Sequence, residues 1–369
     1  MAGTALYLSG GGARGAYQVG VLKAVAEITK AKKVPFDIIS SVSVGSINAI
    51  ALAEHINDFP LAIKTLENFW RHLHTNAVFK ASNWSLIKSV FSNLLYFMVK
   101  RKKPSYLLNS LPLRHLISNN ADFEKIQANI EQGLFQALEM TSNCYDLHKS
   151  ISFYQHFDKE FEDWNLPKHV SRRTEIACEH VLAACAIPLF FPSIKIDGLF
   201  YGDGSLRLIS PLRACIKFNA DKIFVCGGRQ LTDESIERSP IEAIGFSHIL
   251  GNMMNSLFMD NLDRDIELVE HMNAIAELLS RWKMRRSPWR PIDVCYMHPH
   301  FDVAVVADAH YNDMPYLLRF LLNSMGAKQQ SGDLLSFLLF EGDFCGELLD
   351  LAYQETMDRE EQVIDFFDK

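Results

Sequence analysis

The fold is decided by residues 4–15, which read TALYLSGGGARG. The first six residues are a short, mostly apolar run that favours a β-strand, and three glycines end that run. From Ala16 onward, apolar residues recur mostly at intervals of three, which is typical of a helix. The stretch therefore predicts a strand, a tight glycine turn and a helix in direct succession.

A second unit of the same kind follows. Residues 36–44 (FDIISSVSV) form a strand-like run, and residues 47–53 (INAIALA) behind it are helical in composition. Consecutive strand–turn–helix units favour neighbouring parallel strands whose faces are covered by helices. The sequence therefore predicts an α/β fold with a three-layer, parallel-sheet core.

The rest of the chain alternates between helical and strand-like segments. Further β-like runs lie in residues 134–153, 193–201, 222–226 and 292–297. An amphipathic helical stretch runs from about residue 240 to 280. Because no linker or repeat divides the chain, we expect a single domain over residues 1–369. Within it we expect a helical, cap-like insertion at about 65–130 and a mainly helical part at about 240–369.

The composition is that of a globular chain with reduced thiols. Hydrophobic residues make up 48% of the 369 residues, which excludes disorder. The seven cysteines form no C-x-x-C pair and no zinc-ligand spacing, so we expect no metal site. The sequence shows no signal peptide and no run of the roughly 18 apolar residues that a membrane span needs. We expect a cytoplasmic or peripheral membrane protein, although a specialised secretion system would leave no such trace.

The glycine turn matches G-x-G-x-x-G, the pattern of dinucleotide-binding turns. Backbone N–H groups at the start of such a helix attract an anion, whether a pyrophosphate or a transient oxyanion. The acidic residue expected at the end of the second strand is missing, because Asp37 lies at the start of that strand. A nucleotide-binding oxidoreductase therefore stays only an alternative.

Residues 41–46 (SVSVGS) carry the decisive feature of the second unit. Ser43 stands where a buried strand turns sharply into a helix, and Ser41 and Gly45 on either side of it are small. A nucleophile elbow, G-x-S-x-G, needs small residues there because its central serine adopts a strained conformation that exposes Oγ. Serine still satisfies this need in place of the first glycine, so Ser43 is the predicted nucleophile.

A serine nucleophile requires a base within hydrogen-bond reach. Residues 201–205 (YGDGS) place Asp203 in a glycine-flanked turn at the end of a strand. Partial burial there raises the pKa of a carboxyl group and makes it a useful proton acceptor. A Ser-His-Asp triad stays an alternative, because α/β-hydrolases run in the order Ser, Asp, His. The candidate histidines are His248, His271, His298, His300 and His310, of which His298 is best placed.

The glycine turn, the elbow and residues 203–205 (DGS), in this order, resemble the patatin-like phospholipase family, specifically its stand-alone bacterial members. The similarity extends to residues 183–192 (AACAIPLFFP), 210–212 (SPL) and 219–225 (NADKIFV). One departure is Ser205, since the family's last motif usually reads D-G-G or D-G-A.

This resemblance implies a patatin-like hydrolase core and a lipid acyl hydrolase of the phospholipase A or lysophospholipase type. Ser43 and Asp203 would form its catalytic dyad, with no histidine. The oxyanion hole would comprise Gly10, Gly11, Gly12 and Arg14, and the motifs would be supported by Gly15, Gly45 and Gly204. The substrate would be phospholipid or another acyl-ester lipid, with no cofactor and no nucleic acid partner. A non-catalytic lipid-binding or effector protein would keep the same pocket and stays a further alternative.

Two basic segments are candidates for peripheral membrane contact, although the net charge is −7. Residues 84–103 are apolar, helical in pattern and end in four basic residues, so they either lie in a membrane interface or cap the core. Residues 281–290 hold five basic residues and two tryptophans, which suits anionic lipid, nucleic acid or a solvated loop. By contrast, residues 341–369 contain ten acidic residues.

Overall fold

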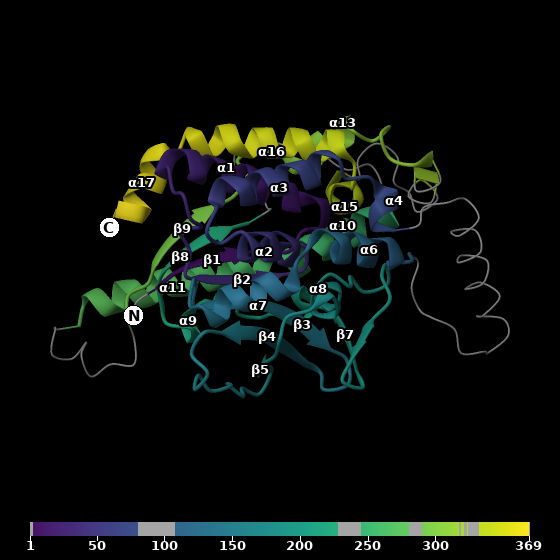
Figure 1. Cartoon of the computed structure of the whole chain (residues 1–369). Coiled ribbons are helices and arrows are strands. Elements are labelled where there is room, and N and C mark those ends of the chain that lie inside the picture. The colour runs from purple at the N-terminus through teal and green to yellow at the C-terminus, as the bar shows by residue number, and fades with distance from the viewer. Residues whose placement is uncertain are drawn as a thin grey trace.

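A mixed sheet of nine strands forms the centre of the computed structural model, with helices on both of its faces (Figure 1). The structure describes residues 3–79, 108–227, 245–279, 290–316, 319–320, 323 and 332–368. Residues 84–103 and 281–289, on which the predicted membrane contacts fall, lie outside these ranges. Arg290 is described, and it forms an ion pair of 2.9 Å with Asp221.

The first two strand–turn–helix units lie where the sequence predicts them. Strand β1 (Gly3–Leu8) leads through the short helix η1 (Gly12–Arg14) into α1 (Gly15–Thr29). Strand β2 (Ile38–Val42) leads directly into α2 (Gly45–Glu54). The two strands pair in parallel, with Ala5 opposite Ile38. Their carboxyl ends, and the turns that follow them, therefore lie at the same edge of the sheet.

The remaining strands extend the sheet in both directions, in the order β5-β4-β3-β2-β1-β8-β9. Their bounds are β3 Ala137–Cys144, β4 Lys149–His156, β5 His169–Arg173, β6 Ile194–Ile196, β7 Leu199–Asp203, β8 Ala220–Cys226 and β9 Asp293–Met297. Strands β3, β2, β1, β8 and β9 are parallel, whereas β4 and β7 each pair antiparallel with β3. The predicted α/β three-layer class is confirmed, but the sheet is mixed rather than wholly parallel.

One layer of helices covers the face of the sheet that carries the larger core. It includes α1, α2, α3 (Phe59–Arg71) and α16 (Gly342–Met357), which supply fully buried side chains such as Tyr17, Leu52, Trp70 and Leu348. Figure 1 shows α1, α3 and α16 running side by side above the strands. The short helices α4 (Thr75–Val78), α6 (Leu111–Asn120) and α7 (Phe123–Glu131) continue this layer.

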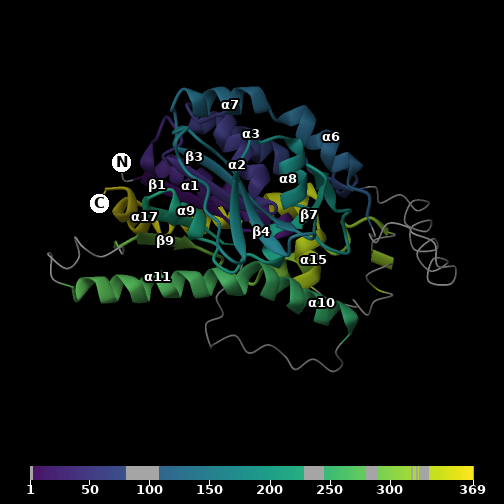
Figure 2. The same cartoon turned by 90° about the horizontal axis from the view of Figure 1, so that it is seen from below.

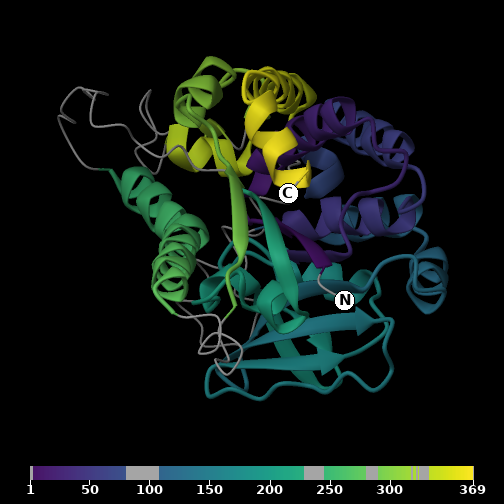
Figure 3. The same cartoon turned by 90° about the vertical axis from the view of Figure 1, so that its left-hand side faces the viewer.

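The opposite face carries a smaller core built around Tyr7, Tyr154 and Phe218. It is covered by α9 (Arg213–Lys217) and by α11 (Asn261–Glu277), which buries Leu262 and Ile266. Helix α10 (Phe246–Asn255) and the π-helical turn η3 (Ser256–Asp260) run into α11 without a break, as Figure 2 shows. In Figure 3 this long helix lies across the sheet from α1 and α16.

The part of the chain after residue 245 is mainly helical, yet it is built into the sheet through β9. It adds α13 (Val303–Ala309), α15 (Gly332–Leu338), α16 and α17 (Glu360–Asp368). The remaining helical elements, α8 (Cys178–Ala184) and η2 (Gly204–Leu206), flank β6 and β7 in the chain. Of the helices that the structure describes, none is both long and apolar enough to cross a bilayer.

The close packing of α1 on α16 predicts that even a methyl side chain at position 20 destabilises the fold. A Cβ at this position would collide with the carbonyl oxygen of Leu349. We expect Gly20→Ala to lower the free energy of unfolding by about 1–3 kcal/mol, as overpacking does, measured by urea denaturation.

Gly346→Ala is the matched control, because it changes a glycine of α16 whose nearest neighbour is the end of the Arg71 side chain, 3.0 Å away. We expect this variant to be neutral or to gain up to about 1 kcal/mol from better helix propensity. Equal destabilisation of both variants would contradict the role given to the Gly20 contact.

Candidate active site

Ser43 lies at the sharp turn between β2 and α2. Its φ is 52°, a left-handed conformation that is rare for a residue other than glycine and is the strained geometry of a nucleophile elbow. A Cβ on Gly45 would collide with the backbone of Leu8. The Ser41 hydroxyl donates to the carbonyl oxygen of Glu139 at 3.0 Å. Packing around the turn therefore requires glycine at position 45, and a buried hydrogen bond holds Ser41 in place.

Strand β3 brings Asp203 to this turn. Val42, the last residue of β2, pairs with Thr141, and the next residue of β3, Ser142, pairs with Asp203 at the end of β7. Because β2 runs parallel to β3 and β7 runs antiparallel to it, the carboxyl ends of the two strands meet head to head. Ser43 and Asp203 are thus neighbours although they are far apart in the sequence.

The Asp203 carboxylate is buried, with 1% of its residue surface exposed. Its Oδ1 accepts a hydrogen bond of 2.9 Å from the amide of Ser205. Its Oδ2 has no hydrogen-bond partner among the described residues. Burial raises the pKa of Asp203 to about 6, and the nearby Ser43 hydroxyl and the Ser205 amide partly oppose this rise. One carboxylate oxygen is therefore free to accept a proton.

The glycine turn adopts backbone angles that only glycine tolerates readily. Gly11 has a φ of 150° and Gly12 a φ of 57°. A Cβ on Gly10 would lie 2.6 Å from the Phe258 ring and 2.9 Å from the Ser205 hydroxyl. The turn is therefore packed directly against the turn that carries Asp203. In the described part of the chain, the amides of Gly11 and Gly12 donate to no acceptor.

Arg14 contacts α15 and α10. Its Nε donates to Ser336 Oγ at 2.8 Å and its Nη1 to Asn255 Oδ1 at 3.1 Å, and its guanidinium lies 4.1 Å from the centre of the Phe337 ring. Its amide donates to the carbonyl oxygen of Gly11 at 3.2 Å. These contacts fix the turn on the C-terminal helices. A direct bond from Arg14 to an oxyanion stays a prediction.

A buried amide network ties the glycine turn to the elbow helix. The Asn48 amide donates to the carbonyl oxygen of Gly15 at 3.0 Å and to Gln18 Oε1 at 2.9 Å. Gln18 donates in turn to the carbonyl oxygen of Ser9 at 2.7 Å, and Trp70 Nε1 donates to Asn48 Oδ1 at 2.9 Å. The local sequence holds only one signal for this network, the single amide Asn48 within the apolar run 47–53, and that signal alone does not predict the partners of Asn48.

His298 and His310, two of the histidines considered for a triad, have other partners. The His298 ring packs on Tyr296 at 4.9 Å, and burial lowers the pKa of His298 to about 4. His310 bonds to Asp313 and Glu347, both at 2.6 Å. As far as the described residues show, no histidine lines the cavity at Ser43, and no cluster of His, Cys, Asp and Glu is placed to hold a metal ion.

Fold and site together define an α/β protein with a serine elbow and a buried carboxylate beside a glycine-rich turn. The sequence profile of the Patatin-like phospholipase family matches residues 6–216, which include Ser43, Asp203 and the whole glycine turn. Because this match spans more than half of the 369 residues, the chain belongs to the patatin-like phospholipase family, a family of lipid hydrolases.

Other comparisons contribute less. No curated protein sequence matches the chain. The crystal structure of VipD from Legionella pneumophila is similar to it with a TM-score of 0.35 and 11% sequence identity, over 91% of this chain and 67% of that one. This likeness is too low to carry a functional argument.

The amide network predicts that Asn48 stabilises the site region. Asn48→Leu removes the printed partners of the buried Trp70 indole N–H and of the buried Gln18 Oε1, and each buried group without a partner costs about 1–3 kcal/mol. We expect a lower urea midpoint of unfolding. Asn252→Leu, on the exposed side of α10, is the matched control and should unfold as the wild type does. An unchanged midpoint for Asn48→Leu would show that this network does not stabilise the folded protein.

Proposed function

We propose that the chain hydrolyses acyl esters of lipids, with Ser43 as nucleophile and Asp203 as general base. The observation that carries this proposal is the register of β3, which sets the ends of β2 and β7 against each other and leaves Asp203 Oδ2 unpartnered. Family membership supports lipid hydrolysis in general. Phospholipase A or lysophospholipase activity is the finer part of the proposal.

In the first half of the reaction, Asp203 Oδ2 accepts the proton of Ser43 Oγ while Oγ attacks the ester carbonyl carbon. The carbonyl oxygen becomes an oxyanion, for which the amides of Gly11 and Gly12 are the available donors. The tetrahedral intermediate then breaks its bond to the alcohol oxygen, which leaves with the proton from Asp203. An acyl-serine ester at Ser43 remains.

In the second half, water attacks the carbonyl carbon of the acyl-serine, and Asp203 accepts its proton. The bond to Ser43 Oγ breaks, Oγ regains the proton, and the fatty acid is released. A pKa of about 6 suits both halves, because Asp203 is mostly ionised at neutral pH and is still basic enough to take a proton.

A non-catalytic lipid-binding protein is the main competing assignment, because it would keep the same fold and the same apolar surroundings. Covalent labelling by a fluorophosphonate probe separates the two, since labelling needs an activated serine. Peripheral membrane contact through residues 84–103 and 281–290 remains a proposal, because nearly all of these residues lie outside the described ranges.

The dyad predicts two inactive variants with different stabilities. Ser43→Ala and Asp203→Asn should each lower kcat/KM on phospholipid and lysophospholipid by at least about 10²-fold. Asp203→Asn should also raise the melting temperature by several degrees, because it removes a buried charge whose raised pKa corresponds to about 3 kcal/mol. Retained activity in either variant would refute the dyad. Loss of activity in a folded His298→Ala or His310→Ala variant would favour the triad instead.

The raised pKa of Asp203 predicts the pH dependence of activity. The ionised form accepts the proton, so kcat/KM should rise with pH through about 6 and level off above it. Stability should change in the opposite sense. Because the pKa is higher in the folded than in the unfolded chain, the contribution of this group is greatest when protonated and is lost as pH rises through about 6. A profile that is flat through this range would exclude Asp203 as the base.

A further inference from the structure

An apolar groove of about 380 Å³ lies beside the candidate active site, between α2, α3, α4 and α6. Its apolar walls include Ala51 of α2, Leu66 of α3 and Ile117 of α6, and the latter two are buried. Among the described residues, no aspartate, glutamate, lysine or arginine lines it. An uncharged, mostly apolar groove of this kind suits a hydrocarbon chain better than a phosphate or a sugar.

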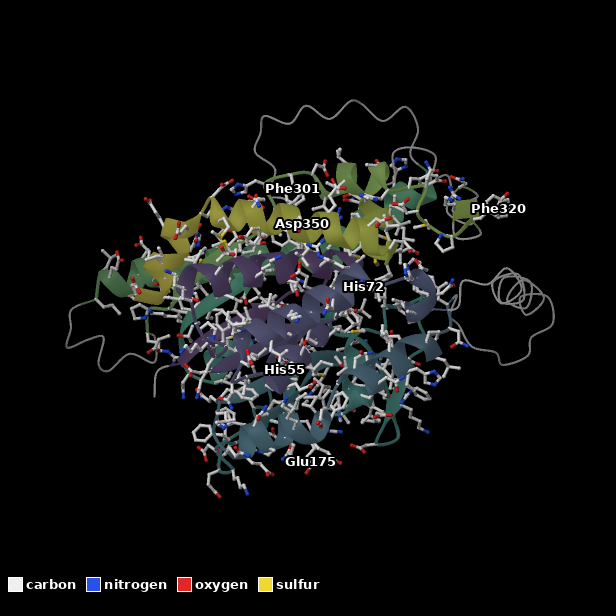
Figure 4. All side chains as sticks on the ribbon, turned by 45° about the horizontal axis from the view of Figure 1, so that its top comes forward. His55, His72, Glu175, Phe301, Phe320 and Asp350 are labelled. Atoms are coloured by element: carbon white, nitrogen blue, oxygen red, sulfur yellow. The ribbon has the colours of Figure 1, made fainter. Side chains whose placement is uncertain are left out.

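The groove residues that are exposed to solvent are all polar. Asn68, His72 and Asn120 line it and are exposed to solvent. Figure 4 shows His72 at the surface, at the end of α3. The groove therefore combines buried apolar residues with exposed polar ones. This is the distribution of polarity that an amphipathic ligand with one apolar chain requires.

The groove adjoins the surroundings of Ser43. A second cavity, of only about 20 Å³, is lined by Ser43 and Gly12. Ile47, Phe69 and Leu73 line both this cavity and the groove. These three side chains thus form the common wall between the nucleophile and the groove. The small cavity has room for about one water molecule, so a chain that passes this wall must displace side chains.

We propose that the groove binds the acyl chain of the ester, and that Ile47, Phe69 and Leu73 are the gate through which the chain reaches the carbonyl at Ser43. This inference rests on the proposed ester hydrolysis. Phe69 is half-buried, so it can turn toward solvent more easily than the buried Leu73. Each methylene that the groove removes from water strengthens binding by about fourfold, so the groove selects long acyl chains.

The test is the chain-length preference of variants that fill the groove from two sides. Ala51→Phe fills it from α2 and Ala77→Phe fills it from α4. Ala274→Phe, on the exposed side of α11, is the matched control. For each protein, kcat/KM is measured on p-nitrophenyl butyrate, octanoate and palmitate. Melting temperatures and fluorophosphonate labelling of Ser43 verify that each variant is folded and competent.

The wild type should prefer palmitate to butyrate. Either groove variant should lower the palmitate-to-butyrate ratio of kcat/KM by about tenfold or more, which corresponds to the loss of about two buried methylenes. The control should keep the wild-type ratio. If a phenylalanine variant fails to fold, the labelling rates of the wild type with long-chain and short-chain alkyl fluorophosphonates supply the same comparison, and equal rates overturn the inference.

The failure of the inference and the failure of the proposed function are distinguishable. If the wild type hydrolyses esters but folded groove variants keep its palmitate-to-butyrate ratio, the acyl site lies elsewhere and the dyad stands. If the wild type hydrolyses no ester and Ser43 is not labelled, the proposed function falls and the groove loses its role with it.

Discussion

The pairing of β3 with two strands that approach from opposite directions is the constraint on which the site depends. Thr141 and Ser142 are adjacent on β3, and they fix the ends of β2 and β7 respectively. A slip of one residue in either pairing would turn the side chains of that strand to the other face of the sheet. Gly204 shows how close the approach is, because a Cβ there would collide with the backbone of Thr141. The register of β3, which carries neither Ser43 nor Asp203, thus determines whether these two residues meet.

The packing that gives Ser43 and Asp203 their unusual conformation and burial also lowers the stability of the folded chain. Ser43 holds a positive φ, and Asp203 is buried with one oxygen unpartnered. Each feature costs free energy that the larger core and the Asn48 network offset. A carboxylate with full hydrogen bonding would be more stable and a weaker base. Strain and desolvation therefore lie at the two residues that the proposed reaction uses.

The parts of the fold that follow from local sequence were predictable, and those that follow from long-range pairing were not. Residues 4–15 and 36–53 determine their own strands and turns through glycine and apolar periodicity. Strand β5 (HVSRR) was overlooked because it is short and polar at the edge of the sheet. The glycine-flanked turn marked Asp203 as a candidate base, but the antiparallel entry of β7 beside β2 has no local signal, so the pairing that brings Asp203 to Ser43 was not predictable. Nor does any local pattern reveal the groove, because its walls come from four helices.

The C-terminal part of the chain belongs to the site, although it lies outside the range 6–216 that the family profile matches. A Cβ on Gly12 would collide with the carbonyl oxygen of Phe337 in α15, so this helix packs directly on the glycine turn. Ser336 and Asn255 hold the Arg14 guanidinium from the same side. In the proposed reaction the amides of Gly11 and Gly12 would point at the developing charge, and their orientation depends on these contacts. The motifs supply the groups proposed to react, and the helices beyond the matched range hold the glycine turn in its shape.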